Sequence, residues 1–124
     1  MQALELWAPE RRALLCRLEM EEGEVFHLEH RNSIYLAPVR ETYRVEAGGR
    51  MRQTGLESPS AGVFEYYGFD PPREGRVDLW QTVGPIRMRS MSYEHHRLLT
   101  GGRVLALRDL ARPGEPLTLG LTES

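Results

Sequence analysis

The polar residues best suited to chemistry gather between residues 30 and 41, in the run H-R-N-S-I-Y-L-A-P-V-R-E. His30, Asn32, Ser33 and Glu41 could form a ligand or catalytic pocket, with Ser33 as nucleophile or hydrogen-bond donor and His30 as base. Alternatively, the same residues form a polar cluster that holds one hairpin, with Asn32 in a turn and Glu41 accepting backbone N–H bonds. The sequence has no G-x-S-x-G nucleophile elbow, which disfavours acyl chemistry.

Glu41 belongs to a segment whose side chains alternate between two faces. Alternation through residues 39–46 puts four residues on one face of a strand: Val39, Glu41, Tyr43 and Val45. If that face meets the core, the carboxylate of Glu41 must be paired, hydrogen-bonded or protonated, because burying a bare charge costs too much free energy. The nearest donors in the sequence are the hydroxyl of Ser33 and the amide of Asn32. A tight return of the chain at residues 36–38 would place the strands on either side next to each other.

Four histidines raise the question of a metal site. His95 and His96 are adjacent, and on a strand they would point to opposite faces, so the pair could not share one ion. Their spacing matches neither H-E-x-x-H nor a Cys/His finger. A metal would need His27 or His30 to converge with one of them. We therefore expect His95 and His96 to be ordinary surface or hairpin-end histidines, and we predict no metal and no cofactor.

Aromatic residues concentrate in the run F-E-Y-Y-G-F at 64–69. They could line an apolar ligand pocket or a partner surface, or they could close the core of a β-sandwich with large rings. The candidate residues for a pocket or partner surface are Phe64, Tyr66, Tyr67 and Trp80. Arg87 and Arg89, two positions apart, share a strand face and could bind an anion together or simply face solvent.

The elements that must position these groups are short. Gly and Pro recur at intervals that leave few gaps for a long helix, and the segments between them, such as 26–30 and 117–122, alternate with period two. Gly pairs in A-G-G-R and T-G-G-R, at 47–50 and 100–103, predict two tight hairpins. Residues 59–75 are expected to form a loop crossing that could cover a sheet edge or a pocket mouth. We predict an all-β, single-domain antiparallel sandwich or barrel of about nine short strands, with at most one short helix.

The N-terminal segment allows two structures. Residues 9–22 begin with Pro and end before Gly23, a pattern typical of a helix. The alternative is a hairpin that pairs residues 3–7 with 12–18. Periodicity does not decide between them.

Composition sets the outer limits. The chain has 124 residues, enough for one domain that spans 1–124, and its mean hydropathy of -0.48 with no long apolar run excludes a membrane-spanning segment. A net charge of -2 argues against a nucleic-acid binder. All sixteen basic residues are Arg, and the sole cysteine, Cys16, is expected to be a buried small hydrophobe that forms no intrachain disulfide. The N-terminus lacks the pattern of a secretory signal.

The run at 26–45 resembles the bacterial family catalogued as domain of unknown function 1850. The residues that carry the resemblance are Asn32, Ser33, Ile34, Pro38, Val39, Glu41 and Tyr43, with S-A-G at 60–62 and the strands G-R-V-L-A-L and P-G-E-P-L-T-L near the C-terminus. The resemblance implies a small extracytoplasmic domain with an N-terminal hydrophobic leader and no established activity, often encoded beside tripartite ATP-independent periplasmic transporters. It also favours the N-terminal hairpin. Asn32 stands where many relatives carry His, and this chain shows no leader.

These observations lead to three functional hypotheses. The first is a non-enzymatic accessory or protein-interaction module linked to solute uptake, whose partner is a membrane transporter component. The second is a small-molecule binding domain with a pocket near Asn32, Ser33 and Glu41, and the third is a small hydrolase. We expect no nucleic-acid partner and no membrane insertion of this chain. The location is extracytoplasmic if the resemblance holds and a leader was removed, and cytoplasmic otherwise.

Overall fold

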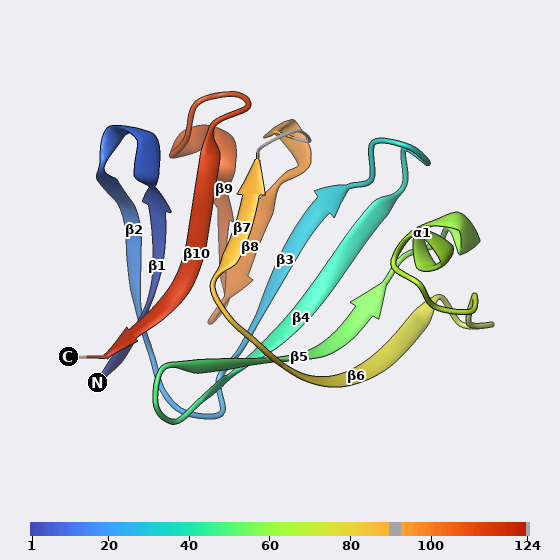
Figure 1. The fold of residues 1–124 in the computed structure, drawn as a ribbon, viewed down its shortest axis with the longest axis horizontal. Coiled ribbons are helices and arrows are strands. Elements are labelled where there is room, and N and C mark those ends of the chain that lie inside the picture. Colours follow the sequence, from blue (N-terminus) through green and yellow to red (C-terminus); the bar gives the residue numbers. More distant parts are fainter. Residues whose placement is uncertain (90–92, 124) are drawn as a thin grey trace.

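Ten strands in two antiparallel sheets make up most of the computed structural model, which describes residues 1–89 and 93–123 (Figure 1). One sheet has the order β2-β1-β10-β7 and the other the order β6-β5-β4-β3-β8-β9. The strands are β1 (Gln2–Ala8), β2 (Ala13–Met20), β3 (Val25–Arg31), β4 (Pro38–Glu46), β5 (Arg50–Glu57), β6 (Arg76–Val83), β7 (Ile86–Arg89), β8 (Arg97–Thr100), β9 (Arg103–Ala106) and β10 (Pro116–Glu123). The prediction of an all-β fold with short strands is confirmed.

The N-terminal segment is a hairpin, and the helical alternative is wrong. β1 pairs with β2 so that Leu4 lies opposite Leu18 and Leu6 opposite Cys16. The turn between them contains a 3-10 helix, η1 (Pro9–Arg11), and ends at Arg12 with a φ of 50°. The alternating burial of β1 is what favours the strand, because leucines at every second position reach one core face. Cys16 is partly buried and packs against this core.

Both hairpins predicted from Gly pairs are present. Gly48 and Gly49 connect β4 to β5 with φ values of 76° and 71°, and Gly101 and Gly102 connect β8 to β9 with φ values of 55° and 77°. Two consecutive residues with positive φ are what a type I′ turn requires, and Gly adopts this conformation without a Cβ clash.

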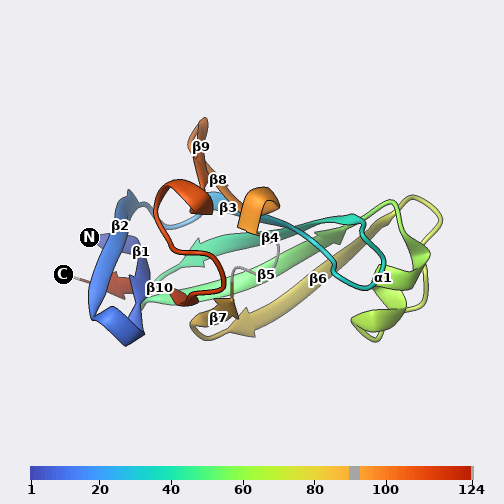
Figure 2. The same ribbon diagram turned by 90° about the horizontal axis from the view of Figure 1, so that it is seen from above.

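The sequence predicted a loop crossing for residues 59–75, but this segment contains a helix, α1 (Ala61–Tyr66). Val63 and Phe64 on this helix are fully buried, and they pack with Val39 and Leu56 of the six-stranded sheet. The burial of these two side chains stabilises a six-residue helix that would not form alone. Figures 1 and 2 show α1 at the end of the six-stranded sheet that lies farthest from β1 and β2.

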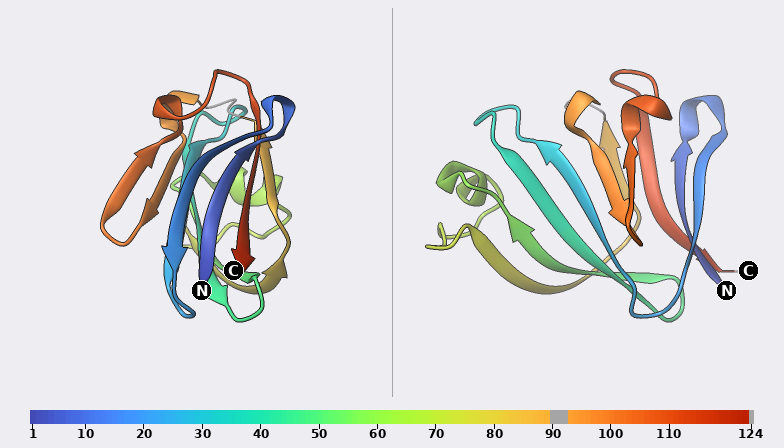
Figure 3. Two further views of the ribbon diagram at one scale, coloured as in Figure 1. Left: turned by 90° about the vertical axis from the view of Figure 1, so that its left-hand side faces the viewer. Right: turned by 180° about the vertical axis from the view of Figure 1, so that it is seen from behind.

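The molecule therefore has two separate apolar clusters. The larger one fills the space between the two sheets, and the smaller one lies under α1. Figure 3 shows the cause, because the four-stranded sheet faces only part of the six-stranded sheet, which continues beyond it towards α1. β4 contributes to both clusters, with Val39 in the smaller and Tyr43 and Val45 in the larger. None of the helices within residues 1–89 and 93–123 has the length and apolar character of a membrane span.

Candidate functional site

Glu41 lies between the two apolar clusters, on the inner face of β4. Its neighbours two positions away on that face are Val39 and Tyr43, as the alternation predicted, and the Glu41 side chain is only 13% exposed. Burial removes water from the carboxylate and raises the pKa of Glu41 above its ordinary value, and a hydrogen bond with Tyr43 offsets part of that rise. A carboxyl group is thus held where both sheets and α1 would otherwise bury hydrocarbon.

His30 is the group nearest to this carboxyl. It comes from the end of β3, and its Nε2 lies 3.9 Å from Oε2 of Glu41. The same nitrogen lies 3.4 Å from the hydroxyl oxygen of Tyr67, the C-cap residue that follows α1. Burial lowers the pKa of His30, which keeps the imidazole neutral at neutral pH. Three elements therefore bring polar side chains to one place.

His96 completes the group from a fourth element. It follows the 3-10 helix η2 (Tyr93–His95), and its ring centroid lies 5.7 Å from that of His30. His96 is only 5% exposed, and its Nδ1 is buried without a hydrogen-bond partner in the described structure. Burial, with a smaller contribution from His30, lowers the pKa of His96 to about 4.

The expectation that both adjacent histidines lie on the surface is wrong for His96. His95 is exposed, and its Nε2 lies 3.4 Å from Nη1 of Arg31, whereas His96 turns into the protein. The sequence argument assumed a strand, and it gave no sign that a 3-10 turn would send one of the two side chains inward. The alternation of Phe26 and Leu28 with their neighbours, by contrast, did indicate that His30 faces inward.

The sequence suggested that Asn32 and Ser33 would donate hydrogen bonds to Glu41. In the described structure these two residues have other roles. Asn32 is buried, and its Oδ1 accepts hydrogen bonds of 3.0 Å from the backbone N–H groups of Ile34 and Tyr35. This side chain therefore closes its own turn, a role that Asn fills well. Ser33 is exposed at the same turn. Both residues lie at the edge of the site, while His30 and Tyr43 provide the contacts to the carboxyl group.

A cavity of about 310 Å³ opens beside these groups. Its inner wall includes Glu41, His30, His96 and Tyr67, while Arg87 and Arg89 of β7 are exposed at its rim. The other residues that line it are Leu28, Arg31, Asn32, Ser33, Tyr66, Ile86 and Met88. The cavity thus lies between the edge strand of the smaller sheet and the face of the larger one, a concave place of the kind that binds ligands.

The four candidate aromatic residues separate into three environments. Tyr66, which is 60% exposed, and Tyr67 line the cavity. Phe64 is buried in the cluster under α1, as the core-closure alternative proposed. Trp80 is 64% exposed on β6, where the guanidinium of Arg52 lies 4.4 Å from the ring centroid. The structure therefore brings together two of the four at the cavity.

These groups can hydrogen-bond and exchange protons with a bound molecule. His30 makes polar contacts with Glu41 and Tyr67. A serine hydrolase would need a contact between His30 and Ser33, and none is present within the described part of the chain. No three His, Cys, Asp or Glu side chains in residues 1–89 and 93–123 converge closely enough to hold a metal ion.

The chain matches no family model, no curated protein and no solved structure. The resemblance to domain of unknown function 1850 thus stays a prediction from the sequence.

Proposed function

We propose that this domain binds a compact, polar small molecule in the cavity beside Glu41. The supporting observation is the buried Nδ1 of His96, which has no hydrogen-bond partner among the described residues and belongs to a residue that lines the cavity with Glu41, His30 and Tyr67. A buried polar atom without a partner costs about 1–3 kcal/mol of stability. A ligand that hydrogen-bonds to it would recover that free energy on binding.

The chemistry of the wall favours a ligand that both donates and accepts hydrogen bonds. A carboxyl with a raised pKa, two imidazoles with lowered pKa values and a phenol can each change their role in a hydrogen bond with little cost. Hydroxyl groups match this requirement. The rings of Tyr66 and Tyr67 offer apolar surface to the carbon atoms that would carry those hydroxyl groups. The proposed ligands are therefore polyhydroxylated compounds. They should be small, because the volume of the cavity is at the lower end of the range usual for ligand pockets.

A thermal-shift screen of polyols and monosaccharides, with amines and carboxylic acids as comparison sets, tests this proposal. A compound at about 100 times its Kd adds roughly 2.7 kcal/mol to the stability of the folded state, which is several degrees in Tm. The expected result is a stabilising polyhydroxylated compound whose effect is lost in Glu41→Gln and in Tyr67→Phe. Glu19→Gln, an exposed position on β2, is the matched control and should keep the effect.

Two results would contradict the proposal. One is a complete absence of stabilising compounds among the polyhydroxylated set. The other is a compound that stabilises the wild-type protein and Glu41→Gln equally, because its site would then lie elsewhere.

An accessory module linked to solute uptake is the second candidate, and a different observation supports it. Ile34, Tyr35 and Leu36 form an exposed apolar tip on the turn between β3 and β4, with exposed fractions of 64%, 46% and 65%. Apolar side chains grouped at a loop tip are typical of a contact with another protein. The test is solute uptake by cells that produce Ile34→Ser/Leu36→Ser in place of the wild-type domain. Loss of uptake with a normal Tm supports docking through this tip, and unchanged uptake contradicts it.

A further inference from the structure

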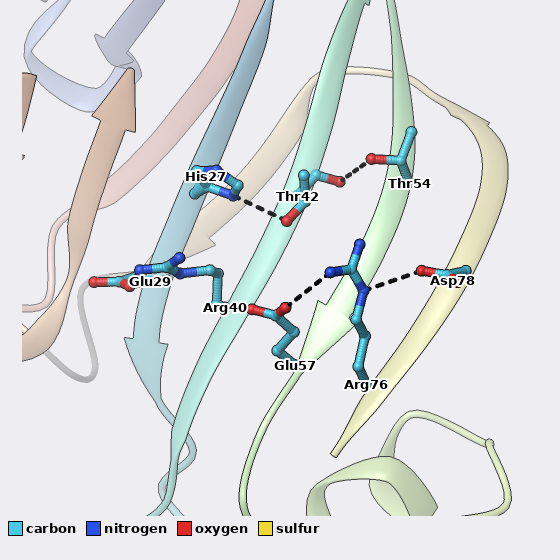
Figure 4. Close-up of polar contacts among 8 residues, drawn as sticks. All are labelled: His27, Glu29, Arg40, Thr42, Thr54, Glu57, Arg76 and Asp78. Carbon is cyan, nitrogen blue, oxygen red and sulfur yellow. Dashed lines mark hydrogen bonds and ion pairs between the residues drawn. The ribbon is translucent and has the colours of Figure 1, made fainter. Parts of the chain in front are cut away.

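Five charged residues form a row across the outer face of the six-stranded sheet, on the side away from Glu41. Each lies directly opposite the next in the strand register, and the charges alternate: Arg97 on β8, Glu29 on β3, Arg40 on β4, Glu57 on β5 and Arg76 on β6. Figure 4 shows four of these side chains, Glu29, Arg40, Glu57 and Arg76, on this face. The row contains three guanidiniums and two carboxylates, and Arg76 at its end also pairs with Asp78 on β6, so the charges of the row and this neighbour balance.

The contacts within the row show how these arginines hold a carboxylate. Arg40 donates from Nε and Nη2 to Oε2 of Glu29, over 2.8 and 2.5 Å, and Arg97 donates from Nη2 to Oε1 over 2.6 Å. Two guanidiniums therefore share a single carboxylate, and they lower the pKa of Glu29 despite its burial. Arg40 and Arg97 keep further N–H donors, because a guanidinium has five.

A groove of about 1,110 Å³ lies over this row. Six arginines and four glutamates line it, whereas the whole chain has sixteen arginines and eighteen acidic residues. The arginines are Arg31, Arg40, Arg73, Arg76, Arg97 and Arg108. The groove is thus a positively charged region on a protein whose net charge is negative.

Two of these arginines form no ion pair with a carboxylate among the described residues. The polar contact of Arg31 in the described residues is with the imidazole of His95, at 3.4 Å, and not with an acidic group. Arg73, in the loop before β6, makes no ion pair in the part of the chain that the structure describes. Arg31 comes from the end of β3 and Arg73 from that loop, and both line the groove whose floor holds Arg40.

We propose that this groove is a second binding site, for a small oxyanion that carries two or more carboxylate or phosphate groups. The planar fork of a guanidinium can bind either a carboxylate or a phosphate group in a bidentate manner. On the groove floor, Arg40 and Arg97 already bind the two oxygens of one carboxylate, that of Glu29. A single negative charge would gain little at exposed side chains, because water and salt screen it. Two or more acidic groups can contact several arginines at once, and the affinity then rises with the charge of the ligand.

Calorimetric titration with acetate, citrate and pyrophosphate tests this proposal, with sodium chloride added to give every titration the same ionic strength. Citrate or pyrophosphate should bind, and acetate should not bind measurably. Binding by citrate alone identifies carboxylates as the ligand groups, and binding by pyrophosphate alone identifies phosphates. The double variant Arg31→Gln/Arg73→Gln should weaken binding by at least about tenfold, which corresponds to about 1.4 kcal/mol.

Arg44→Gln/Arg103→Gln is the control, because it removes the same charge from two exposed positions outside the groove. It should change the affinity by less than about twofold, and circular dichroism melts should show that both double variants are folded. Equal weakening in the two double variants would overturn the proposal, since it would reveal a general charge effect. A failure of both citrate and pyrophosphate to bind more tightly than acetate would overturn it as well. Glu41→Gln should bind these anions normally, which separates this site from the cavity on the inner face.

Discussion

His30 and Glu41 lie diagonally across neighbouring strands on the inner face of the six-stranded sheet, with His30 Nε2 3.9 Å from Glu41 Oε2. Leu28 is the residue directly opposite Glu41. Burial raises the pKa of the carboxyl and lowers that of the imidazole, so both shifts disfavour the charged forms. The pair is therefore a weakly coupled polar contact at a cavity and not a strong structural ion pair.

Glu41→Gln should raise the stability of the unliganded protein at pH 8. The pKa of Glu41 is higher in the folded state than the ordinary 4.5, so its effect on stability is most favourable below that value and is lost as pH rises through the folded pKa. The neutral amide avoids this loss. We expect a Tm increase of about 3 °C at pH 8, which corresponds to about 1 kcal/mol for a domain of this size, and little change at pH 4.

Melting curves of the two proteins at both pH values check this expectation. A fall of several degrees for Glu41→Gln at pH 8 would show instead that the carboxylate supports the fold.

His96→Phe should make the protein less sensitive to acid. The pKa of His96 falls from 6.5 to about 4 on folding, so the unfolded chain takes up a proton that the folded chain refuses as pH falls through this range. Because of this residue, the free energy of unfolding of the wild-type protein should fall by up to about 3 kcal/mol between pH 6.5 and pH 4. His30, whose pKa is also lowered, remains in both proteins and contributes in the same direction.

Urea unfolding of the wild-type protein and His96→Phe at pH 7 and pH 4.5 measures the difference. The variant should lose less stability between the two pH values. An identical loss in both proteins would mean that His96 is protonated in the folded state.

Gly62→Ala should destabilise the protein through a contact with one ring. A Cβ at Gly62 would overlap the ring of Tyr35, which lies in the turn between β3 and β4. Tyr35 is 46% exposed and could move outwards, so we expect a moderate loss of about 1–2 kcal/mol. The S-A-G motif thus keeps a small residue where α1 meets this turn.

The double variant Gly62→Ala/Tyr35→Ala separates this clash from any other effect of the substitution. In the Tyr35→Ala background, alanine at position 62 should be neutral or stabilising, because Ala favours a helix by about 1 kcal/mol over Gly. The same loss in both backgrounds, measured by urea unfolding, would rule out the ring as the cause.

Arg11→Lys should lower the Tm, although it preserves the charge. Arg11 donates from Nε and Nη2 to the two carboxylate oxygens of Glu115, over 2.7 and 2.9 Å, and so ties η1 to the segment before β10. An ammonium group cannot make this paired contact. The same guanidinium lowers the pKa of Glu115, so the contribution of the pair is present above the ordinary pKa of 4.5 and is lost as pH falls through the folded value.

Differential scanning calorimetry at pH 7 and pH 3 compares the wild-type protein with Arg11→Lys and Glu115→Gln. Both variants should melt below the wild type at pH 7, and the difference should shrink at pH 3. If Arg11→Lys has the same Tm as the wild type at pH 7, the positive charge alone accounts for the contribution of Arg11 to stability.

Local rules were reliable wherever neighbouring residues decide the structure. Gly48 and Gly49 led to the correct hairpin, because positive φ at two successive residues is a property of the residues themselves. Residues 9–22 could not be assigned in this way, because Leu18 and Met20 need a core on one side before alternation is favoured over a helix. The helix α1 was missed for the same reason, since Phe64 and Val63 are helical only where Val39 and Leu56 cover them.

By itself, the sequence determined that Glu41 shares a face with Val39, Tyr43 and Val45, because side chains on a strand alternate whatever surrounds it. Only the tertiary structure decided which groups meet that carboxyl. Asn32 and Ser33, close in sequence, turn to their own loop or to solvent, while Tyr67 and His96 reach the cavity from elements far along the chain. Such convergence depends on how two sheets and a short helix bury their apolar faces together, and no local pattern of residues encodes it.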